Sequence, residues 1–591
     1  MTRRRHASAR SRLAVVVVAA ATLAGGCTAS EPSSGPEPTT EPGSPPTPTV
    51  GPSPTHGTSP SEAPSAEATE TPSDPPDETA LDSMGVSAGD PAAVEAGTEV
   101  LADGGSAVDA AIATAFAVSV VEPFASGVGG GGATLVVPTV GDEEPQAYDY
   151  REVVPDDGVV PPGGTGVPGF VAGMAELHAD HGRLEWSRLL EPAIELASDG
   201  HPVSEVLAGL LDTPTGRQVA AENPQFTTGG TPLGEGETLV QDELAATLGV
   251  LADEGADAFY TGTLSSDLAA APGLDPGSLA GYQVVRSQPA RGALGDHEVL
   301  AAAPPLPGAA LVQQLQVAEA LGVADLEPGT ADHTHRLAGA WQVADGTAQT
   351  LLGDPAFVDV PLDEITDPGA NAELAGALPI DPSVDGPAPA GPAPAVPERA
   401  DLAEAGNTTH VSVVDADGLA VSMTNTITHF WGSGQSVGGF FLNDQLTRFE
   451  AIGTTDANEP APGRRSVSWS IPAVVVDGED RPVLAIGTPG GRRIPNILTG
   501  VVARWVLHDQ SLEEAVAAPR AHAEGQILQM EAAPDAATAD ALAGLGYSIE
   551  VPDPEDHVFG SVQALAIDHG AREVRGAEDT RRDGTFTVVD R

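Results

Sequence analysis

The stretch Asn407-Thr-Thr-His-Val-Ser-Val-Val-Asp-Ala-Asp-Gly-Leu-Ala-Val-Ser-Met-Thr-Asn-Thr426 decides the fold of this chain. Its centre, Asp417-Gly418, is the strongest short signal for a hairpin turn, and the flanks alternate β-branched with small residues. We therefore expect two antiparallel strands joined by a two-residue loop, with Thr409 opposite Thr426. Thr408 and Thr426 would then be neighbours, and a one-residue slip in register would still leave a threonine near Thr408.

A threonine that begins a strand after a long flexible stretch suggests a nucleophile made by cutting the chain in front of it. The Thr408 hydroxyl would attack the carbonyl of Asn407, the ester would be hydrolysed, and Thr408 would become a new N-terminus. Its α-amine, with an ordinary pKa of about 7.7 to 8.0, can then act as the base for its own hydroxyl. The hairpin alone does not decide this, because threonine is also favoured in an ordinary strand.

Six more segments occur in order along the chain: Gly105-Ser-Ala-Val-Asp-Ala-Ala111, Val121-Glu-Pro-Phe-Ala-Ser-Gly-Val-Gly-Gly-Gly-Gly132, Tyr148-Asp-Tyr-Arg-Glu152, Val167-Pro-Gly-Phe170, Leu442-Asn-Asp-Gln445 and Gly487-Thr-Pro-Gly-Gly-Arg-Arg493. With the hairpin they resemble the γ-glutamyltransferases, self-cleaving N-terminal-nucleophile hydrolases, from about residue 81 to the C-terminus. The resemblance implies an α/β (α+β) fold, a four-layer αββα sandwich of two autoproteolytic fragments. The large subunit would be 81–407 and the small catalytic subunit 408–591.

The resemblance also assigns catalytic roles, residue by residue. Thr408 is the nucleophile and its amine the base, and cleavage falls between Asn407 and Thr408. Thr426 matches the residue that hydrogen-bonds the nucleophile. Gly490 and Gly491 match the pair whose backbone N–H groups form the oxyanion hole, where glycine permits the required backbone dihedrals. The resemblance implies neither a metal nor a cofactor.

Donor binding is assigned to three positions. Arg151 matches the arginine that grips the α-carboxylate of a γ-glutamyl donor, a task for which a guanidinium offers two parallel donors. Otherwise Arg151 is a surface arginine in an ion pair. Ser468 matches one of two adjacent carboxylate-binding serines, and Gln445 matches a polar residue of the pocket.

Other positions depart from the family pattern. Trp469 replaces the second serine, and Thr428 stands where an asparagine commonly helps to bind substrate. Arg448 stands where the family usually has an aspartate that pairs with the α-ammonium of the donor, and an arginine would repel that cation. The stretch 449–465 is short for the lid loop of some bacterial members.

These observations predict an enzyme with intact catalytic residues and altered donor recognition. The leading hypothesis is transfer of the γ-glutamyl group of glutathione or a related amide to water, an amino acid or a peptide. Because of Arg448, the alternative is an acylase for glutaryl amides, cephalosporin-type donors or polyglutamate. A third hypothesis, from another class, is an inactive lipid-anchored binding protein.

The composition excludes several kinds of function. The chain has 591 residues, with 85 acidic and 26 basic residues and a net charge of −59. All the basic residues are arginine. This acidity argues against DNA or RNA partners, which need a cationic surface. The absence of lysine excludes a Schiff-base lysine and a P-loop lysine.

The N-terminus has the pattern of a signal peptide. Five arginines precede an apolar run at 13–23, and the only cysteine, Cys27, follows small residues as in a bacterial lipobox. We expect a signal peptide at 1–27, lipidation of Cys27, and anchoring of the protein to the outer face of a bacterial cell membrane. The alternative is an ordinary secretory signal. Residues 28–80 are nearly all Pro, Ser, Thr, Glu, Gly and Ala, which predicts a disordered stalk.

Local patterns predict helices at 90–104, 106–121, 186–198, 241–251, 496–507 and 534–545, and strands at 438–442, 471–476 and 483–487. Gly434-Gln-Ser-Val-Gly438 matches the nucleophile elbow of serine hydrolases, but we reject that interpretation because no helix pattern follows it. The Gly127–Gly132 run predicts close backbone packing. The pairs His178/His181 and His333/His335 lack the clustering of metal ligands.

Overall fold

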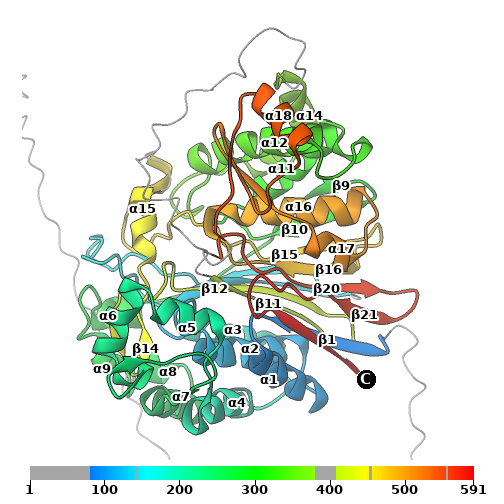
Figure 1. Cartoon of the computed structure of the whole chain (residues 1–591). Coiled ribbons are helices and arrows are strands. Elements are labelled where there is room, and N and C mark those ends of the chain that lie inside the picture. Colours follow the sequence, from blue (N-terminus) through cyan, green and yellow to red (C-terminus); the bar gives the residue numbers. More distant parts are fainter. Residues whose placement is uncertain (1–79, 140–142, 380–407, 452–455, 554–556) are drawn as a thin grey trace, which may run out of the picture. The chain divides into compact units, whose positions relative to one another are not determined.

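The computed structural model describes residues 80–139, 143–379, 408–451, 456–553 and 557–591. Within this part, two β-sheets lie face to face and helices cover the outer face of each (Figure 1). The arrangement is the four-layer αββα sandwich implied by the resemblance, so the predicted fold class is confirmed. The predicted lipidation site Cys27, the cleavage residue Asn407, and nearly all of the stalk at 28–80 lie outside the described residues.

The predicted hairpin lies at the centre of the first sheet. This sheet has seven strands in the order β22-β1-β11-β12-β2-β3-β8. Their bounds are Thr585–Asp590 for β22, Ser83–Ala88 for β1, Thr408–Val414 for β11, Ala420–Thr426 for β12, Gly131–Val137 for β2, Gln146–Asp149 for β3 and Val285–Ser287 for β8. Every residue of β11 and β12 is buried, as expected for central strands covered on both faces.

The register of the hairpin differs by one residue from our prediction. Thr408, and not Thr409, lies opposite Thr426. The loop is longer than two residues because the carboxylate of Asp415 accepts hydrogen bonds from the N–H groups of Asp417 and Leu419. Gly418 has a φ of 77°, which fits a three-residue loop that ends in a left-handed glycine. The slip brings the two threonines directly opposite each other.

The second sheet has six strands in the order β21-β20-β16-β15-β10-β9. Their bounds are Glu573–Gly576 for β21, Gln563–Asp568 for β20, Pro482–Gly487 for β16, Ala473–Val476 for β15, His297–Ala301 for β10 and Ala290–Leu294 for β9. Aliphatic side chains of both sheets form one cluster between them, to which Leu135 and Val414 contribute from the first sheet and Val474 and Leu565 from the second. Burial of this layer drives the stacking.

Polar side chains also join the two sheets. The Ser422 hydroxyl donates to the carbonyl of Ile486 at 3.0 Å and accepts from the N–H of Ala473 at 2.9 Å. The Ser412 hydroxyl donates to the carbonyl of Gln563 at 3.1 Å. Since side chains alternate along a strand, Thr408 shares the face of β11 that carries Ser412, and therefore faces the second sheet.

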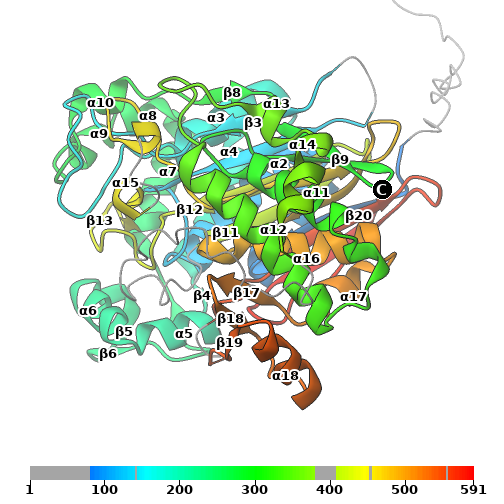
Figure 2. The same cartoon turned by 90° about the horizontal axis from the view of Figure 1, so that it is seen from above.

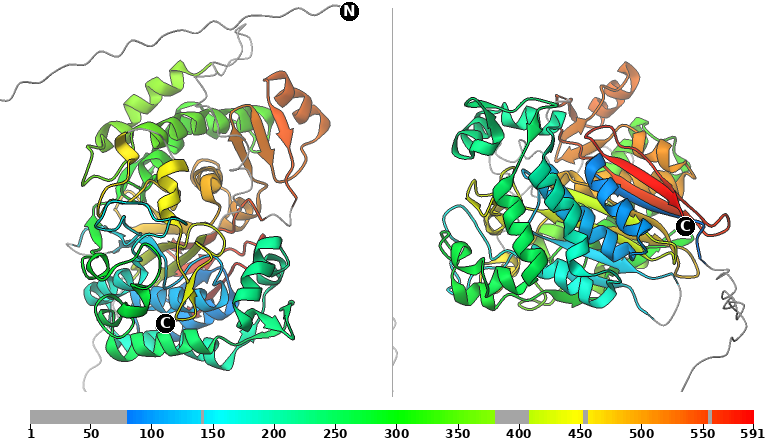
Figure 3. Two further views of the ribbon diagram at one scale, coloured as in Figure 1. Left: turned by 90° about the vertical axis from the view of Figure 1, so that its left-hand side faces the viewer. Right: turned by 90° about the horizontal axis from the view of Figure 1, so that it is seen from below.

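The first helical layer is built on two sequence patterns that predicted their helices correctly. Asp90 caps α1, Pro91–Ala102, and Ser106 caps α2, Ala107–Val121, which is buried along its whole length. These helices pack on the first sheet together with α3, Phe170–His181 (Figure 3, right). α4, Trp186–Asp199, packs against α2, and α7, Asp242–Glu254, packs against α4. α4 and α7 confirm the helices predicted at 186–198 and 241–251.

The second helical layer covers the six-stranded sheet (Figure 2). It contains α11, Gly308–Ala320, α12, Ala331–Thr350, α16, Ile494–Leu507, and α17, Leu512–Ala517. Next to it lie α18, Ala536–Gly544, and a small sheet of β17, Ala521–Glu524, β18, Ile527–Met530, and β19, Ser548–Glu550. α16 and α18 confirm the predicted helices at 496–507 and 534–545.

Shorter elements lie around these layers. The helices are α5, Glu205–Leu211, α6, Pro214–Glu222, α8, Asp257–Tyr260, α9, Ser265–Leu268, α10, Pro276–Ala280, α13, Leu362–Ile365, α14, Pro368–Ala377, and α15, Arg448–Ala451. The two-residue strands are β4, His201–Pro202, β5, Thr227–Thr228, β6, Thr231–Pro232, β7, Thr238–Leu239, β13, Ser436–Val437, and β14, Phe440–Phe441.

Two local predictions can now be judged. The strand predicted at 438–442 is only β14, because Gly438 and Gly439 both have positive φ and precede it as a turn. The close packing predicted for Gly127–Gly132 is confirmed, since a Cβ atom on Gly130 would lie 2.3 Å from the carbonyl oxygen of Thr426.

Replacing Gly487 by alanine should destabilise the protein by about 2 kcal/mol or more. A Cβ atom there would lie 2.1 Å from Cε1 of His410, whose buried ring is held between the hydroxyls of Thr424 and Ser412. Urea unfolding would measure the loss. The control is Gly346→Ala on exposed helix surface, where a Cβ meets no atom within 4 Å and a gain of up to about 1 kcal/mol is expected. A Gly487→Ala protein as stable as wild type would contradict the prediction.

Candidate active site

The site is built around the opposed threonines at the end of the hairpin. Oγ1 of Thr408 lies 3.4 Å from Oγ1 of Thr426, and both residues are buried. The Thr426 hydroxyl also accepts a hydrogen bond from the N–H of Thr428 at 2.8 Å, which fixes its orientation. The predicted proximity of Thr408 and Thr426 is therefore confirmed.

Thr428 has a strained backbone and begins a chain of hydrogen bonds. Its φ is 85°, a conformation that is rare for a β-branched residue and typical of functional sites. Its hydroxyl donates to Oε1 of Gln445, and Nε2 of Gln445 donates to the hydroxyl of Ser466 at 2.9 Å. The chain joins two predicted donor-binding residues to Ser466, which the sequence analysis did not assign.

Gly490 and Gly491 connect β16 to α16 and have φ values of 145° and 55°. Two successive positive φ values are accessible to glycine and can aim neighbouring N–H groups at one anion. His410 packs against Gly487, the last residue of β16. Because Thr408 lies two residues before His410 towards the strand end, the Gly490-Gly491 turn lies at the same end of the inter-sheet layer as Thr408.

Arg151 is fully buried, and its guanidinium forms an ion pair with a carboxylate of the same chain. Its guanidinium makes a two-point contact with Asp149, at 3.1 and 2.7 Å, and donates to the carbonyl of Ser466 at 2.7 Å. The alternative interpretation of Arg151, a surface arginine in an ion pair, is therefore wrong about exposure and correct about pairing. Arg465 also lies 3.3 Å from Asp149. Burial alone would raise the pKa of Asp149, but the two arginines hold that pKa below its ordinary value.

The charges of Arg151, Arg465 and Asp149 favour an anionic ligand. Two guanidinium groups share one carboxylate, so the cluster of Arg151, Arg465 and Asp149 carries one net positive charge. The backbone of Arg151 lies against Gly131, because a Cβ atom there would lie 2.7 Å from Cα of Arg151, and Gly131 pairs with Thr426, the strand neighbour of Thr408. The cluster can therefore attract an anionic group without losing its internal ion pair.

The remaining predicted residues are all buried. Ser468 lies two residues beyond Ser466, and Trp469 packs against Trp341 in the core of the second helical layer, with ring centroids 6.0 Å apart. Trp469 therefore fills space and cannot replace a serine hydroxyl. Arg448 is 6% exposed, and its carbonyl accepts from Asn458, whose side chain in turn accepts from the N–H of Val467.

The GxSxG motif and the histidine pairs make contacts within the protein. Ser436 lies in an exposed two-residue strand, and its hydroxyl donates to Asn223, so it is not at a nucleophile elbow. Among the described residues, no three His, Cys, Asp or Glu side chains are grouped as metal ligands. The histidine pairs are engaged within the protein; for example, His181 contacts the hydroxyl of Tyr148 and His335 that of Tyr547. No helix in the described segments is long and apolar enough to cross a membrane.

Glu152 is a buried acid that the sequence analysis did not single out. Neither carboxylate oxygen has a hydrogen-bond partner within the described residues, and Oε2 lies 3.0 Å from the Cβ position of Gly131. Burial raises the pKa of Glu152 to about 8, although Arg151 opposes the shift. The side chain is therefore mostly protonated at pH 7. The sequence feature that could have pointed to Glu152 is its position directly after Arg151 in the Tyr148–Glu152 segment.

Replacing Glu152 by glutamine should increase stability relative to wild type as the pH rises from 5 to 8. The unfolded glutamate ionises near pH 4.5 and the folded one near 8, so wild type loses stability across this window whereas glutamine does not titrate. The difference in free energy of unfolding between Glu152→Gln and wild type should increase by up to about 4 kcal/mol. Denaturant unfolding at several pH values would measure it. Glu222→Gln, at an exposed site, is the control. If the free energies of unfolding of Glu152→Gln and wild type change with pH in the same way, the prediction is refuted.

Sequence comparison places this site in a known family. The family described as Gamma-glutamyltranspeptidase matches residues 93–589. The chain belongs to the γ-glutamyltranspeptidase family. This confirms the resemblance that was inferred from the seven segments.

Members of the γ-glutamyltranspeptidase family with different names are similar to this chain. The capsule biosynthesis protein CapD proenzyme of Bacillus anthracis is 34% identical over 80% of this chain and 85% of its own length. The glutathione hydrolase proenzyme of Pseudomonas aeruginosa is 34% identical over 81% and 90%. The acylase ACY 1 proenzyme of Pseudomonas sp. (strain SE83) is 32% identical over 81% and 88%.

The fold is also shared with a solved structure. The crystal structure of a cephalosporin acylase from Bacillus halodurans matches with a TM-score of 0.73 and covers 88% of this chain and 98% of that chain. Sequence identity is 22%, so this likeness shows the fold alone. The family assignment is thus secure, and the choice of substrate within the family depends on the residues of the site.

Proposed function

We propose that this protein is a self-cleaving γ-glutamyltransferase or glutathione hydrolase in which Thr408 carries the acyl group. The observation that supports this most directly is the contact between the hydroxyls of Thr408 and Thr426 at the end of a buried strand. The names of the relatives, which include proenzymes of a glutathione hydrolase and of CapD, also support processing into two fragments.

The proposed reaction uses groups that converge on this strand end. After cleavage, the α-amine of Thr408 takes the hydroxyl proton while Oγ1 attacks the γ-carbonyl carbon of the donor. The N–H groups of Gly490 and Gly491 stabilise the oxyanion. The amine returns the proton to the leaving nitrogen as the C–N bond breaks. Water or an amino acid then releases the acyl group by the same route, and Thr426 keeps the Thr408 hydroxyl oriented throughout.

Donor recognition is proposed to depend on the charged cluster described above. The net positive charge of Arg151, Arg465 and Asp149 favours a donor that ends in a carboxylate. Gln445, Ser466 and Thr428 form a hydrogen-bonded chain next to it, which can fix the position of polar atoms of that donor. Ser468 is proposed to contribute a further hydroxyl.

The second candidate is an acylase that takes donors with an anionic, amine-free end. Arg448 favours this alternative, because a guanidinium at the position usually held by an aspartate disfavours an α-ammonium group. The similarity to the acylase ACY 1 proenzyme also supports it. Both candidates form an ester on Thr408 by the same steps and differ in the donor, and therefore in the acyl group that Thr408 carries.

Trapping the acyl-enzyme tests the proposal. The purified protein would be mixed with γ-glutamyl or glutaryl anilide, quenched in acid and digested. The mass of the peptide that begins at Thr408 would then be measured by mass spectrometry. An acyl group on this peptide is expected from at least one donor, and its absence with both would overturn the proposal. Intact mass of the same sample would report the cleavage position and the proposed lipid on Cys27.

A further inference from the structure

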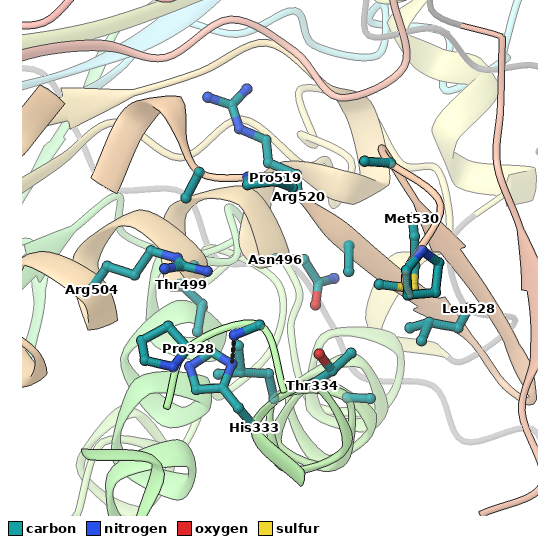
Figure 4. Close-up of a pocket in the computed structure, with 18 of the residues that line it drawn as sticks. Pro328, His333, Thr334, Asn496, Thr499, Arg504, Pro519, Arg520, Leu528 and Met530 are labelled. Atoms are coloured by element: carbon teal, nitrogen blue, oxygen red, sulfur yellow. Dashed lines mark hydrogen bonds between the residues drawn. The ribbon is translucent and has the colours of Figure 1, made fainter. Parts of the chain in front are cut away.

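A cavity of 420 Å³ lies in the second helical layer, between α12, α16, α17, α18 and the small sheet of β17 and β18. None of its lining residues belongs to the candidate active site. Its size is within the range of cavities that hold small molecules. Figure 4 shows Arg504, Thr499 and His333 on one side, Leu528 and Met530 on the other, and the polar side chains of Asn496 and Thr334 between them.

Arg504 is a half-buried cation without a carboxylate partner. Across the described residues no acidic side chain lies within ion-pair distance of it, and its guanidinium makes one hydrogen bond, to Gln510 at 3.3 Å. Burial lowers the pKa of Arg504, which is the expected cost of an uncompensated charge. In a protein with a net charge of −59, an arginine without an acidic partner is unexpected.

Two further buried polar atoms in the same wall lack partners. Oγ1 of Thr499 and Nε2 of His333 have no hydrogen-bond partner among the residues that the structure describes, but both atoms are inaccessible to solvent, so neither is open to a ligand in the cavity. Burial, with Arg504 and His508 nearby, lowers the pKa of His333 to about 4, which keeps the ring neutral.

Arg504 therefore supplies the positive charge of this wall, whereas Leu528 and Met530 on the other side are apolar. Asp535 also lines the cavity, and its carboxylate accepts a hydrogen bond from the N–H of Thr538 at the start of α18. A half-buried guanidinium without an acidic partner is costly, so an anionic acceptor is expected beside Arg504. Arg520 also lines the cavity, but its guanidinium points away in Figure 4 and pairs with Asp579 and the carbonyl of Phe559. It adds no free donor to the cavity.

We propose that this cavity is a second binding site, for a small amphipathic carboxylate. The carboxylate is held by Arg504, and the apolar chain lies against Leu528 and Met530. Neither the substrate nor the chemistry of the candidate active site is needed for this proposal.

Octanoate, titrated into the purified protein by calorimetry, tests the site. Wild type should bind octanoate, whereas Arg504→Gln should bind at least about 10-fold more weakly, because a charge-assisted contact is lost. Octylamine, which has the same chain and the opposite charge, should not bind. Absence of binding by wild type, equal binding by Arg504→Gln, or equal binding of octylamine would each overturn the proposal.

A second variant tests whether octanoate binds in the cavity itself, independently of any effect of a substitution on folding. Gly500 lines the cavity within α16, and a Cβ atom there meets no atom within 4 Å, so Gly500→Leu fills the space without a clash at the backbone. It should abolish octanoate binding. Gly346→Leu makes the same change on exposed surface of α12 and should bind like wild type. Melting temperatures close to wild type would show that the variants fold, and undiminished binding by Gly500→Leu would refute the site.

Discussion

Thr408→Ala is expected to leave a single full-length band on a denaturing gel and to lower amide hydrolysis by at least about 1,000-fold. The variant lacks the hydroxyl that would attack the carbonyl of Asn407, so no new N-terminus forms. Without that terminus there is neither an amine base nor a nucleophile. The gel measures cleavage, and release of anilide from γ-glutamyl and glutaryl donors measures turnover.

Thr408→Ser is the matched control, because it keeps a hydroxyl at the same position. It should be cleaved and retain part of the activity. A melting temperature close to wild type for Thr408→Ala would show that the αββα core forms without cleavage. Two fragments from Thr408→Ala, or wild-type turnover by an uncut chain, would disprove the self-cleavage mechanism and leave the inactive binding protein as the better hypothesis.

Arg448→Asp is expected to shift donor preference towards the γ-glutamyl donor. If the second candidate, the acylase, is correct, Arg448 makes glutaryl anilide the better donor of the wild type, because that substrate lacks the α-ammonium group of a γ-glutamyl anilide. An aspartate would attract this ammonium instead. We expect the ratio of kcat/KM for γ-glutamyl over glutaryl donor to rise about 100-fold, which corresponds to about 3 kcal/mol.

The control variants separate charge from packing. Arg448→Leu removes the cation without adding an anion and should give an intermediate ratio. Arg217→Asp makes the same charge change at an exposed site on α6 and should leave the ratio unchanged. If wild type turns over the γ-glutamyl donor faster, or if Arg448→Asp leaves the ratio as it was, Arg448 does not select the donor.

Much of the fold was predictable because local patterns agree with tertiary burial. The caps at Asp90 and Ser106 fix the starts of α1 and α2, and the nearly all-apolar surface of α2 matches its complete burial. The register of the hairpin was predicted one residue off, since Asp417-Gly418 suggests the shortest loop. The carboxylate of Asp415, which lies outside that dipeptide, selects the longer one. Side-chain hydrogen bonds of this kind are not visible in a dipeptide rule.

The site was predicted less completely than the fold. Thr408 and Thr426 could be paired from strand register alone. Asp149, the ion-pair partner of Arg151, lies in the same short segment. The contact of Arg151 with Ser466 and the approach of Arg465 to Asp149 could not be predicted, because Ser466 and Arg465 are more than 300 residues away along the chain and only the stacking of the sheets brings them close. The strain at Thr428 also escaped prediction, since its side chain favours ordinary strand geometry and only tertiary contacts can hold a φ of 85°.

The order of strands within each sheet has a consequence for the mature protein. In the first sheet, β11 and β12 from the segment after residue 407 are flanked by β1 and β2 from the segment before it. In the second sheet, β15 is hydrogen-bonded to β10 in the same manner. Two polypeptides produced by a cut at Thr408 would thus be interleaved through both sheets. Their separation would require melting of the whole core, so dilution alone should never dissociate them.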